Sequence, residues 1–158
     1  MDGAAQTGDR LTDVSVKVSA EYMGRPGDIA RGRELARRFL ARARTARGVA
    51  VSDRAVEVVQ LVVSELLTNA CKYAPGPSLV DLELAEDRVE VTVWDSAPVL
   101  PVPESADPGR IGRHGLEIVM AVCQSFEVHR EPVGKRMRAA VGLADDRNDM
   151  ATAPGRPA

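Results

Sequence analysis

The segment SDRAVEVVQLVVSELLTNACKYA, residues 52–74, restricts the fold more than any other part of the chain. Its apolar residues follow the spacing of an amphipathic helix. Ser52 is suited to cap the start of this helix, and Pro75 disfavours helical geometry at Ala74. The sequence therefore predicts one long helix here, the longest element of the chain.

Alternating apolar and polar residues predict strands before and after this helix. Val14, Val16 and Val18 alternate with polar residues, as in a half-buried strand. Downstream, two alternating runs are separated by Ala-Glu-Asp-Arg, which is typical of a hairpin. The predicted strands cover about 11–20, 79–84, 89–93, 126–131 and 136–143.

Two shorter helices are also predicted. Asp28 is suited to cap the first, which continues at helical spacing over about 28–47 until Gly48 ends it. The second, GLEIVMAVCQS, follows a loop at 97–115 that is rich in proline and glycine. This order of elements predicts an α+β two-layer sandwich, with a mixed, mostly antiparallel sheet covered on one face by about three helices.

The 158 residues fit a single domain. Residues 1–10 and 146–158 lack an apolar period and are expected to be flexible tails around a folded domain at 11–145.

The sequence has no apolar stretch long enough to cross a membrane, and its start lacks the apolar core of a signal peptide. Cys71 and Cys123 lie in apolar runs without a CxxC motif, which fits reduced thiols. A cytoplasmic protein without membrane contact is expected.

The charge pattern restricts the classes of partner. A net charge of -2 excludes a globally basic nucleic-acid binder. The segment 31–47 nevertheless contains seven arginines and one glutamate. These predict either a solvated helix surface or a surface that meets an acidic partner through Arg–carboxylate contacts. Direct nucleic-acid binding is not expected.

The long helix carries the first candidate site. Glu65, Asn69 and either Lys72 or Tyr73 lie about one turn apart, so a carboxylate and a carboxamide share one face. This spacing suits a divalent cation held by the Asn oxygen, with the Glu orienting or deprotonating a nucleophile. The alternative is that this helix has a solvated stripe, formed by Ser64, Glu65, Thr68, Asn69 and Lys72.

Asp95 ends the apolar strand VEVTVW. A carboxylate at such a position is either a turn-former or an acceptor for an exocyclic amine, such as that of adenine. Gly109, Gly112 and Gly115 punctuate the loop that leads into the last helix. Glycines and a helix N-terminus together favour phosphate, although this segment does not follow the Walker pattern.

These three elements, in this order, resemble the Bergerat or GHKL fold of histidine-kinase-like ATPases. SELLTNACKYA, VWDSAPVLP and GRHGLEIV resemble bacterial anti-sigma-factor serine kinases, and the resemblance covers about residues 12–143. It implies that Glu65 is the catalytic carboxylate, that Asn69 holds Mg²⁺ and that Asp95 binds the adenine of ATP. The other positions expected to contact the nucleotide are Lys72, Tyr73, Gly112, Arg113, His114, Gly115 and Leu116.

The sequence departs from the pattern of that family at two places. Ser96, Ala97 and Pro98 replace the usual glycines after the adenine-binding Asp. A hydroxyl that is common on the penultimate strand is missing, and Arg136 and Met137 stand there instead. These departures predict a weak affinity for nucleotide.

The resemblance also implies function and partners. It implies a serine kinase that acts on an anti-anti-sigma protein of the STAS type. It also implies an anti-sigma factor that binds a sigma factor, so that transcription is regulated by which of the two partners is bound. A homodimer is common in the family. The alternatives are a non-catalytic ATP-binding module that sequesters a partner and a detached catalytic domain of a histidine kinase.

Overall fold

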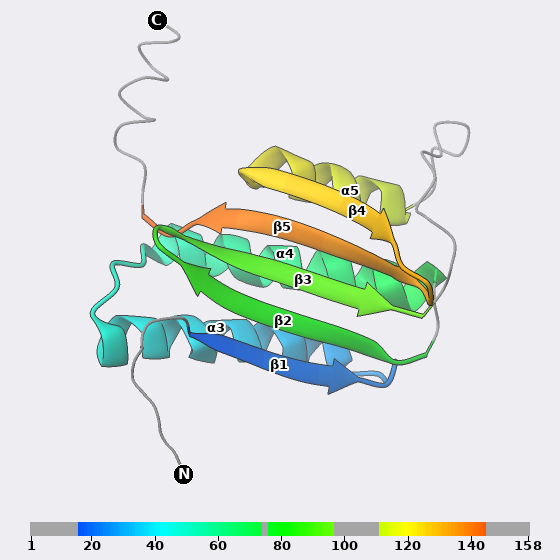
Figure 1. Cartoon of the computed structure of the whole chain (residues 1–158), viewed down its shortest axis with the longest axis horizontal. Helices are drawn as coiled ribbons and strands as arrows, with labels where there is room; N and C mark the ends of the chain where they lie inside the picture. Colours follow the sequence, from blue (N-terminus) through cyan, green and yellow to red (C-terminus); the bar gives the residue numbers. More distant parts are fainter. Residues whose placement is uncertain (1–15, 74–75, 97–110, 145–158) are drawn as a thin grey trace, which may run out of the picture.

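The structure, a computed structural model, describes residues 16–73, 76–96 and 111–144. Within these residues the chain forms three helices and five strands (Figure 1). The elements are β1 (Lys17–Tyr22), α3 (Asp28–Arg47), α4 (Asp53–Tyr73), β2 (Ser78–Ala85), β3 (Arg88–Asp95), α5 (Ile111–Val122), β4 (Ser125–Arg130) and β5 (Lys135–Gly142).

The strands form one sheet in the order β1-β2-β3-β5-β4, and each pairing between them is antiparallel. The three helices all lie on one face of this sheet (Figure 1). The predicted α+β two-layer sandwich is therefore confirmed. In Figure 1 the end of α4, the end of β3 and the beginnings of α5 and β5 lie at the same end of the molecule.

The core lies between the sheet and the helices. On β3 the helix-facing residues Val89, Val91 and Val93 are fully buried, as the period of two requires. The helices α3 and α4 approach each other closely at Gly32, where a β-carbon would lie 2.5 Å from Leu67 Cδ1. Helix α4 therefore packs against both α3 and the sheet, and its buried residues belong to the core between them.

Helix α4 begins as the sequence predicts, since Ser52 Oγ accepts a hydrogen bond of 2.9 Å from the backbone N–H of Ala55. The expected role of Asp28 at the start of α3 is wrong. Gly27 is the N-cap, and Asp28 instead accepts hydrogen bonds from the backbone N–H groups of Gly24 and Arg25 in the preceding turn, at 2.8 and 2.7 Å. The helix ends at Gly48, as predicted.

Helix α5 begins at Ile111, earlier than the predicted start near Gly115. The prediction began the helix at Gly115, the last glycine of the expected loop, but glycine keeps its backbone N–H, and its cost in a helix is conformational entropy of only about 1 kcal/mol relative to alanine. Gly112 and Gly115 therefore belong to the helix. The rest of the expected 97–115 loop, and both predicted tails, lie outside the described residues.

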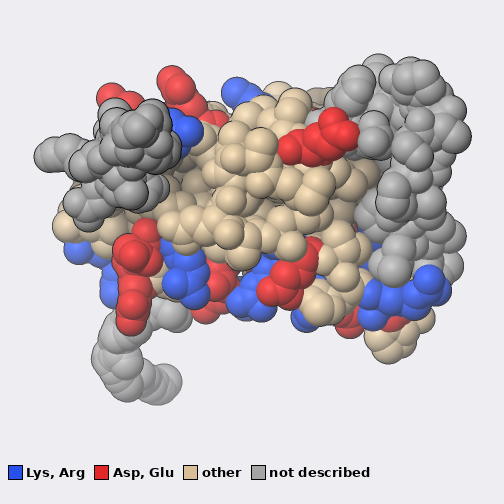
Figure 2. Space-filling model, turned by 90° about the horizontal axis from the view of Figure 1, so that it is seen from above, with Lys and Arg blue, Asp and Glu red and all other residues tan. Residues whose placement is uncertain are grey.

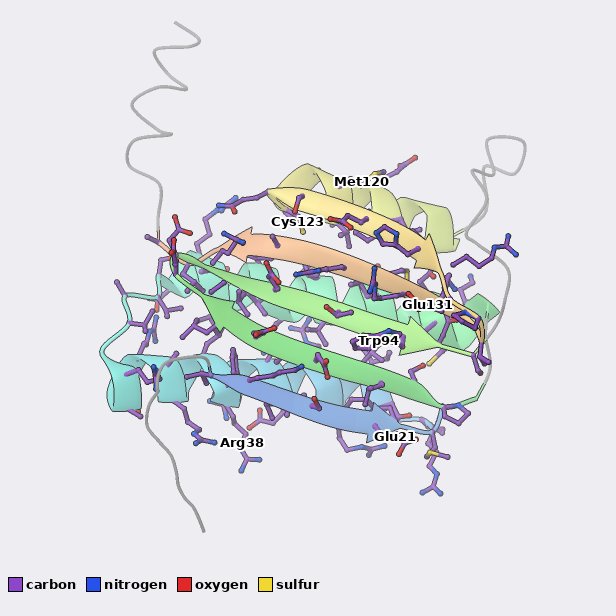
Figure 3. All side chains as sticks on the ribbon, in the orientation of Figure 1. Glu21, Arg38, Trp94, Met120, Cys123 and Glu131 are labelled. Atoms are coloured by element: carbon purple, nitrogen blue, oxygen red, sulfur yellow. The ribbon has the colours of Figure 1, made fainter. Side chains whose placement is uncertain are left out.

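The face of the sheet away from the helices is polar. Glu90 of β3 accepts hydrogen bonds from Arg138 of β5 and from Arg88. Figure 2, seen from above, shows charged side chains concentrated along one side of the molecule, while much of the face toward the viewer is uncharged. Met120 of α5, labelled in Figure 3, is exposed. None of the described helices has the length and apolar character that crossing a membrane requires.

Candidate functional site

Asn69 is the most unusual polar residue of α4. It is 1% exposed, and neither its Oδ1 nor its Nδ2 has a hydrogen-bond partner among the described residues. A buried amide without partners is costly, and such a group in a folded protein calls for a specific explanation. The interpretation of this helix face as a solvated stripe is therefore wrong at Asn69, although Lys72 on the next turn is exposed.

Glu65 lies one turn before Asn69 and connects α4 with α5. It is half-buried, and its carboxylate lies so close to Gly115 that a β-carbon on residue 115 would overlap Glu65 Oε1. Gly115 itself is buried. The glycine thus permits close contact between the carboxylate of α4 and the first turns of α5.

The beginning of α5 supplies backbone donors. Its first four residues, Ile111 to His114, have backbone N–H groups that no intrahelical carbonyl accepts, and the helix dipole favours an anion there. The side chains of Arg113, His114 and Tyr73 lie outside the description of the structure, and so does the burial of Gly112. Leu116 is half-buried and packs against the core, so a packing role accounts for it.

Asp95, at the end of β3, lies inside the protein and is paired. Its side chain and that of Lys135 are both 0% exposed, and Lys135 Nζ donates to Asp95 Oδ2. The backbone N–H of Lys135 donates to Asp95 Oδ1 at 3.3 Å. The two residues face each other in the register between β3 and β5. Burial excludes the reading of Asp95 as a solvated turn-former.

Lys135 was missed by sequence reasoning, which placed Arg136 and Met137 at this position of the strand. In the structure Met137 is fully buried and pairs with Val93 across the two strands. Arg136 pairs with Trp94, and both lie on the polar face of the sheet. The available signal was the alternation of β5: Lys135 shares its face with the apolar Met137 and Ala139. Trp94 is half-buried and lies on the polar face of the sheet, opposite to the face of Asp95.

The donor set limits what metal the site could hold. Among the described residues, His, Cys, Asp and Glu side chains do not gather in groups of three or more that could hold an ion. A single amide oxygen at Asn69 fits Mg²⁺, which keeps several waters and takes further oxygens from bound phosphates.

Both cysteines are free thiols, and burial raises the pKa of Cys123 to about 11. Cys123 is therefore protonated at neutral pH.

Comparisons with known proteins identify the family and the fold. The model of the histidine kinase-like ATPase domain matches residues 26–141. A structure of the RsbU and RsbW domains of Rv1364c from Mycobacterium tuberculosis is 14% identical, with a TM-score of 0.61 over 82% of this chain and 33% of that chain. The chain thus spans about a third of that protein's length. Its low identity supports the fold alone.

Two histidine kinases are more distant in structure. The histidine kinase domain of the blue-light activated kinase from Erythrobacter litoralis EL346 is 23% identical, with a TM-score of 0.44 over 62% of this chain and 47% of that one. AdeS from Acinetobacter baumannii is 10% identical, with a TM-score of 0.45 over 81% and 68%. The search of curated proteins found no match.

Proposed function

The chain belongs to the histidine kinase-like ATPase domain family, and from that premise we propose that it is an ATP-binding anti-sigma factor that phosphorylates a serine of an anti-anti-sigma partner of the STAS type. The observation that carries the proposal is the unpartnered amide of the buried Asn69, one turn from Glu65. Such an amide is explained by a ligand that binds there. A protein acting on sigma factors works in the cytoplasm.

Each part of the site has a distinct task in this proposal. Asn69 Oδ1 would hold Mg²⁺, and the unpaired N–H groups at the beginning of α5 would bind phosphate oxygens. Asp95 would accept a hydrogen bond from the exocyclic amine of adenine. The bound metal ion would neutralise negative charge on the phosphates. Lys72, which is exposed on the turn after Asn69, is available to the nucleotide from solvent.

Glu65 is the candidate general base. In the proposed transfer, the serine oxygen of the partner forms a bond to the γ-phosphorus, and its proton passes to the Glu65 carboxylate. The bond between the γ-phosphorus and the bridging oxygen breaks, and its electron pair stays on ADP. The contact with Gly115 holds the carboxylate beside the start of α5, where the phosphates would bind.

The arginines of α3 form the candidate surface for an acidic partner. Some have structural partners: Arg44 donates to the carbonyl of Val51 at 2.9 and 2.6 Å and also contacts Asp53. Arg38 is strongly exposed and extends outward from α3 (Figure 3). It lies with Arg42 beside a cavity that is partly lined by the apolar Leu35 and Phe39. Glu34 also lines this cavity, 3.9 Å from Arg38. Because arginines are in excess over this one carboxylate, the cavity suits an acidic, partly apolar segment of a sigma factor.

One observation favours the second candidate, a non-catalytic module that sequesters its partner. The carboxylate expected to bind adenine is already paired with Lys135 inside the protein. If this pair persists, nucleotide binding loses the contribution of Asp95, and a protein that binds nucleotide too weakly for transfer would act only through its surface.

A phosphate-transfer assay distinguishes the serine kinase from the non-catalytic sequestering module. The protein is incubated with Mg²⁺, ATP labelled on the γ-phosphate, and a STAS-type protein from the same genome. We expect labelled serine on the partner, and about 100-fold slower labelling with Glu65→Gln. Glu57→Gln, an exposed glutamate on the same helix, is the matched control and should label at the parent rate. Tight partner binding without any transfer would favour the sequestering module.

A further inference from the structure

The buried pair of Asp95 and Lys135 lies within the proposed base-binding part of the site. The two residues are opposite each other at the end of the β3–β5 ladder, and both point to the helix-covered face of the sheet. Both side chains are 0% exposed. Charged side chains are almost never fully buried unless they are paired, so each of these two requires the other.

Residue 135 uses both oxygens of the carboxylate. Its ammonium donates to Oδ2, and its backbone N–H donates to Oδ1 at 3.3 Å. The residue before it holds this arrangement in place: Gly134 has a φ of 85°, and a β-carbon there would overlap the backbone carbonyl of Asp95. The backbone of residue 135 is therefore fixed against the end of β3, and its side chain extends from a defined point.

An ammonium and an exocyclic amine need the same acceptor. Both donate N–H groups, and both would bind the carboxylate of Asp95. Both partners are charged in the bond between the ammonium and the carboxylate, whereas only the acceptor is charged in a bond from the adenine amine, so the ammonium is the stronger donor. Because both side chains are 0% exposed, the amine of a nucleotide reaches the carboxylate of Asp95 only when Lys135 moves aside.

We propose that Lys135 is a specificity-determining residue of the nucleotide site, whose ammonium occupies the position of the adenine amine on Asp95. This inference rests on the proposed function, since it takes Asp95 as the base-reading residue. As a consequence, the amine of ATP adds little to the affinity of the parent protein for this nucleotide. Its affinity for nucleotide then comes from the phosphates and the metal at Asn69.

Two substitutions and one nucleotide test this inference. Lys135→Thr replaces the ammonium with a short hydroxyl, and Lys135→Met removes the charge but keeps an apolar chain of similar length. Inosine triphosphate carries an oxygen in place of the adenine amine. Arg136→Thr, on the same strand but the opposite face, is the matched control.

Calorimetric titrations with Mg²⁺ and each nucleotide give the readout. We expect the parent to bind ATP and inosine triphosphate within about threefold of each other, and Lys135→Thr to bind ATP about tenfold more tightly or better. The affinity for inosine triphosphate should not rise with it. Arg136→Thr should behave as the parent. Because the parent itself is measured with both nucleotides, the test holds even if the Lys135 variants fail to fold.

Several outcomes would overturn the inference. If the parent prefers ATP by more than tenfold, Asp95 is accessible to the amine despite Lys135. If it prefers inosine triphosphate by more than tenfold, the ammonium donates to the base and does not exclude it. If Lys135→Thr and Lys135→Met fold and bind ATP as the parent does, Lys135 does not control the site, and the proposed function stands. If no variant binds either nucleotide, the proposed function itself fails.

Discussion

The carboxylate of Glu65 lies against Gly115, in the space that a β-carbon on residue 115 would occupy. This contact joins the helix that carries the candidate base to the helix whose first turn offers donors to phosphate. The two helices pack side by side, so the contact is held by their whole interface. A glycine is needed at this position because the carboxylate fills the place of its side chain.

Gly115→Ala should reduce phosphate transfer without reducing stability. The new methyl group would push the Glu65 carboxylate aside, while alanine favours the helix by about 1 kcal/mol over glycine. Gly32→Ala is the contrast, because its methyl group would meet Leu67 Cδ1 at 2.5 Å in the packed core and should cost about 1–3 kcal/mol of stability. Urea denaturation and the transfer assay measure both effects. Transfer at the parent rate in Gly115→Ala would refute the positioning role of this glycine.

Asn69→Leu should stabilise the protein and abolish its metal-dependent nucleotide binding. Leucine has a similar volume and leaves no buried amide without a partner, so the free energy of unfolding should rise by about 1–3 kcal/mol. Gln60→Leu on the same helix is the control, because the amide of Gln60 donates to the carbonyl of Arg33 at 3.3 Å. A gain in stability at Gln60 equal to that at Asn69 would show that the unpartnered amide is not the cause.

Asp95→Asn should destabilise the fold by about 3–5 kcal/mol, since it leaves the ammonium of Lys135 buried without a counter-charge. The double variant Asp95→Asn with Lys135→Met removes both charges and should recover most of this loss. Chemical denaturation of the two variants and the parent checks this. If the double variant is as unstable as Asp95→Asn alone, the loss does not come from the unpaired charge.

Glu90 should make stability depend on pH in the acid range. A hydrogen bond from Arg138 holds the pKa of Glu90 below its usual value, and Arg88 acts in the same direction. A folded-state pKa below the unfolded value of about 4.3 gives stability that is present above that pH and is lost as the pH falls through the folded-state pKa. Glu90→Gln should therefore cost up to about 1 kcal/mol at pH 7 and progressively less below pH 4.

Urea denaturation of parent and Glu90→Gln from pH 7 to pH 3 provides the test. Glu57→Gln serves as the control, because that glutamate is exposed. A difference between Glu90→Gln and the parent that stays constant over this range would mean that the ion pair does not act through the ionised carboxylate.

The fold was predictable because its signals are local. Helix α4 runs over Asp53–Tyr73 against the predicted 52–74, since its apolar spacing, its cap at Ser52 and the following proline all lie within one segment. Strand alternation located the five strands in the same way. The start of α5 was misplaced because glycines suit both a loop and a first helical turn, and only the packing against α4 decides between them.

The site was predictable only in part, because its decisive features depend on contacts between distant segments. Glu65, Asn69 and Asp95 could be selected by residue type and spacing. The burial of Asn69 and the contact of Glu65 with Gly115 depend on how the elements pack around α4, which no helical pattern reveals. The pairing of Asp95 with Lys135 joins residues 40 positions apart through the register of two strands.

The most direct test of the account is a calorimetric titration of the parent protein with ATP in the presence and absence of Mg²⁺. The account predicts saturable binding that weakens about tenfold or more when the metal is chelated, because Asn69 holds the nucleotide through the metal. The same titration of Asn69→Leu should show no difference between the two conditions. Binding in the parent that is unaffected by both Mg²⁺ and Asn69→Leu, or no binding of ATP at all, would contradict the account.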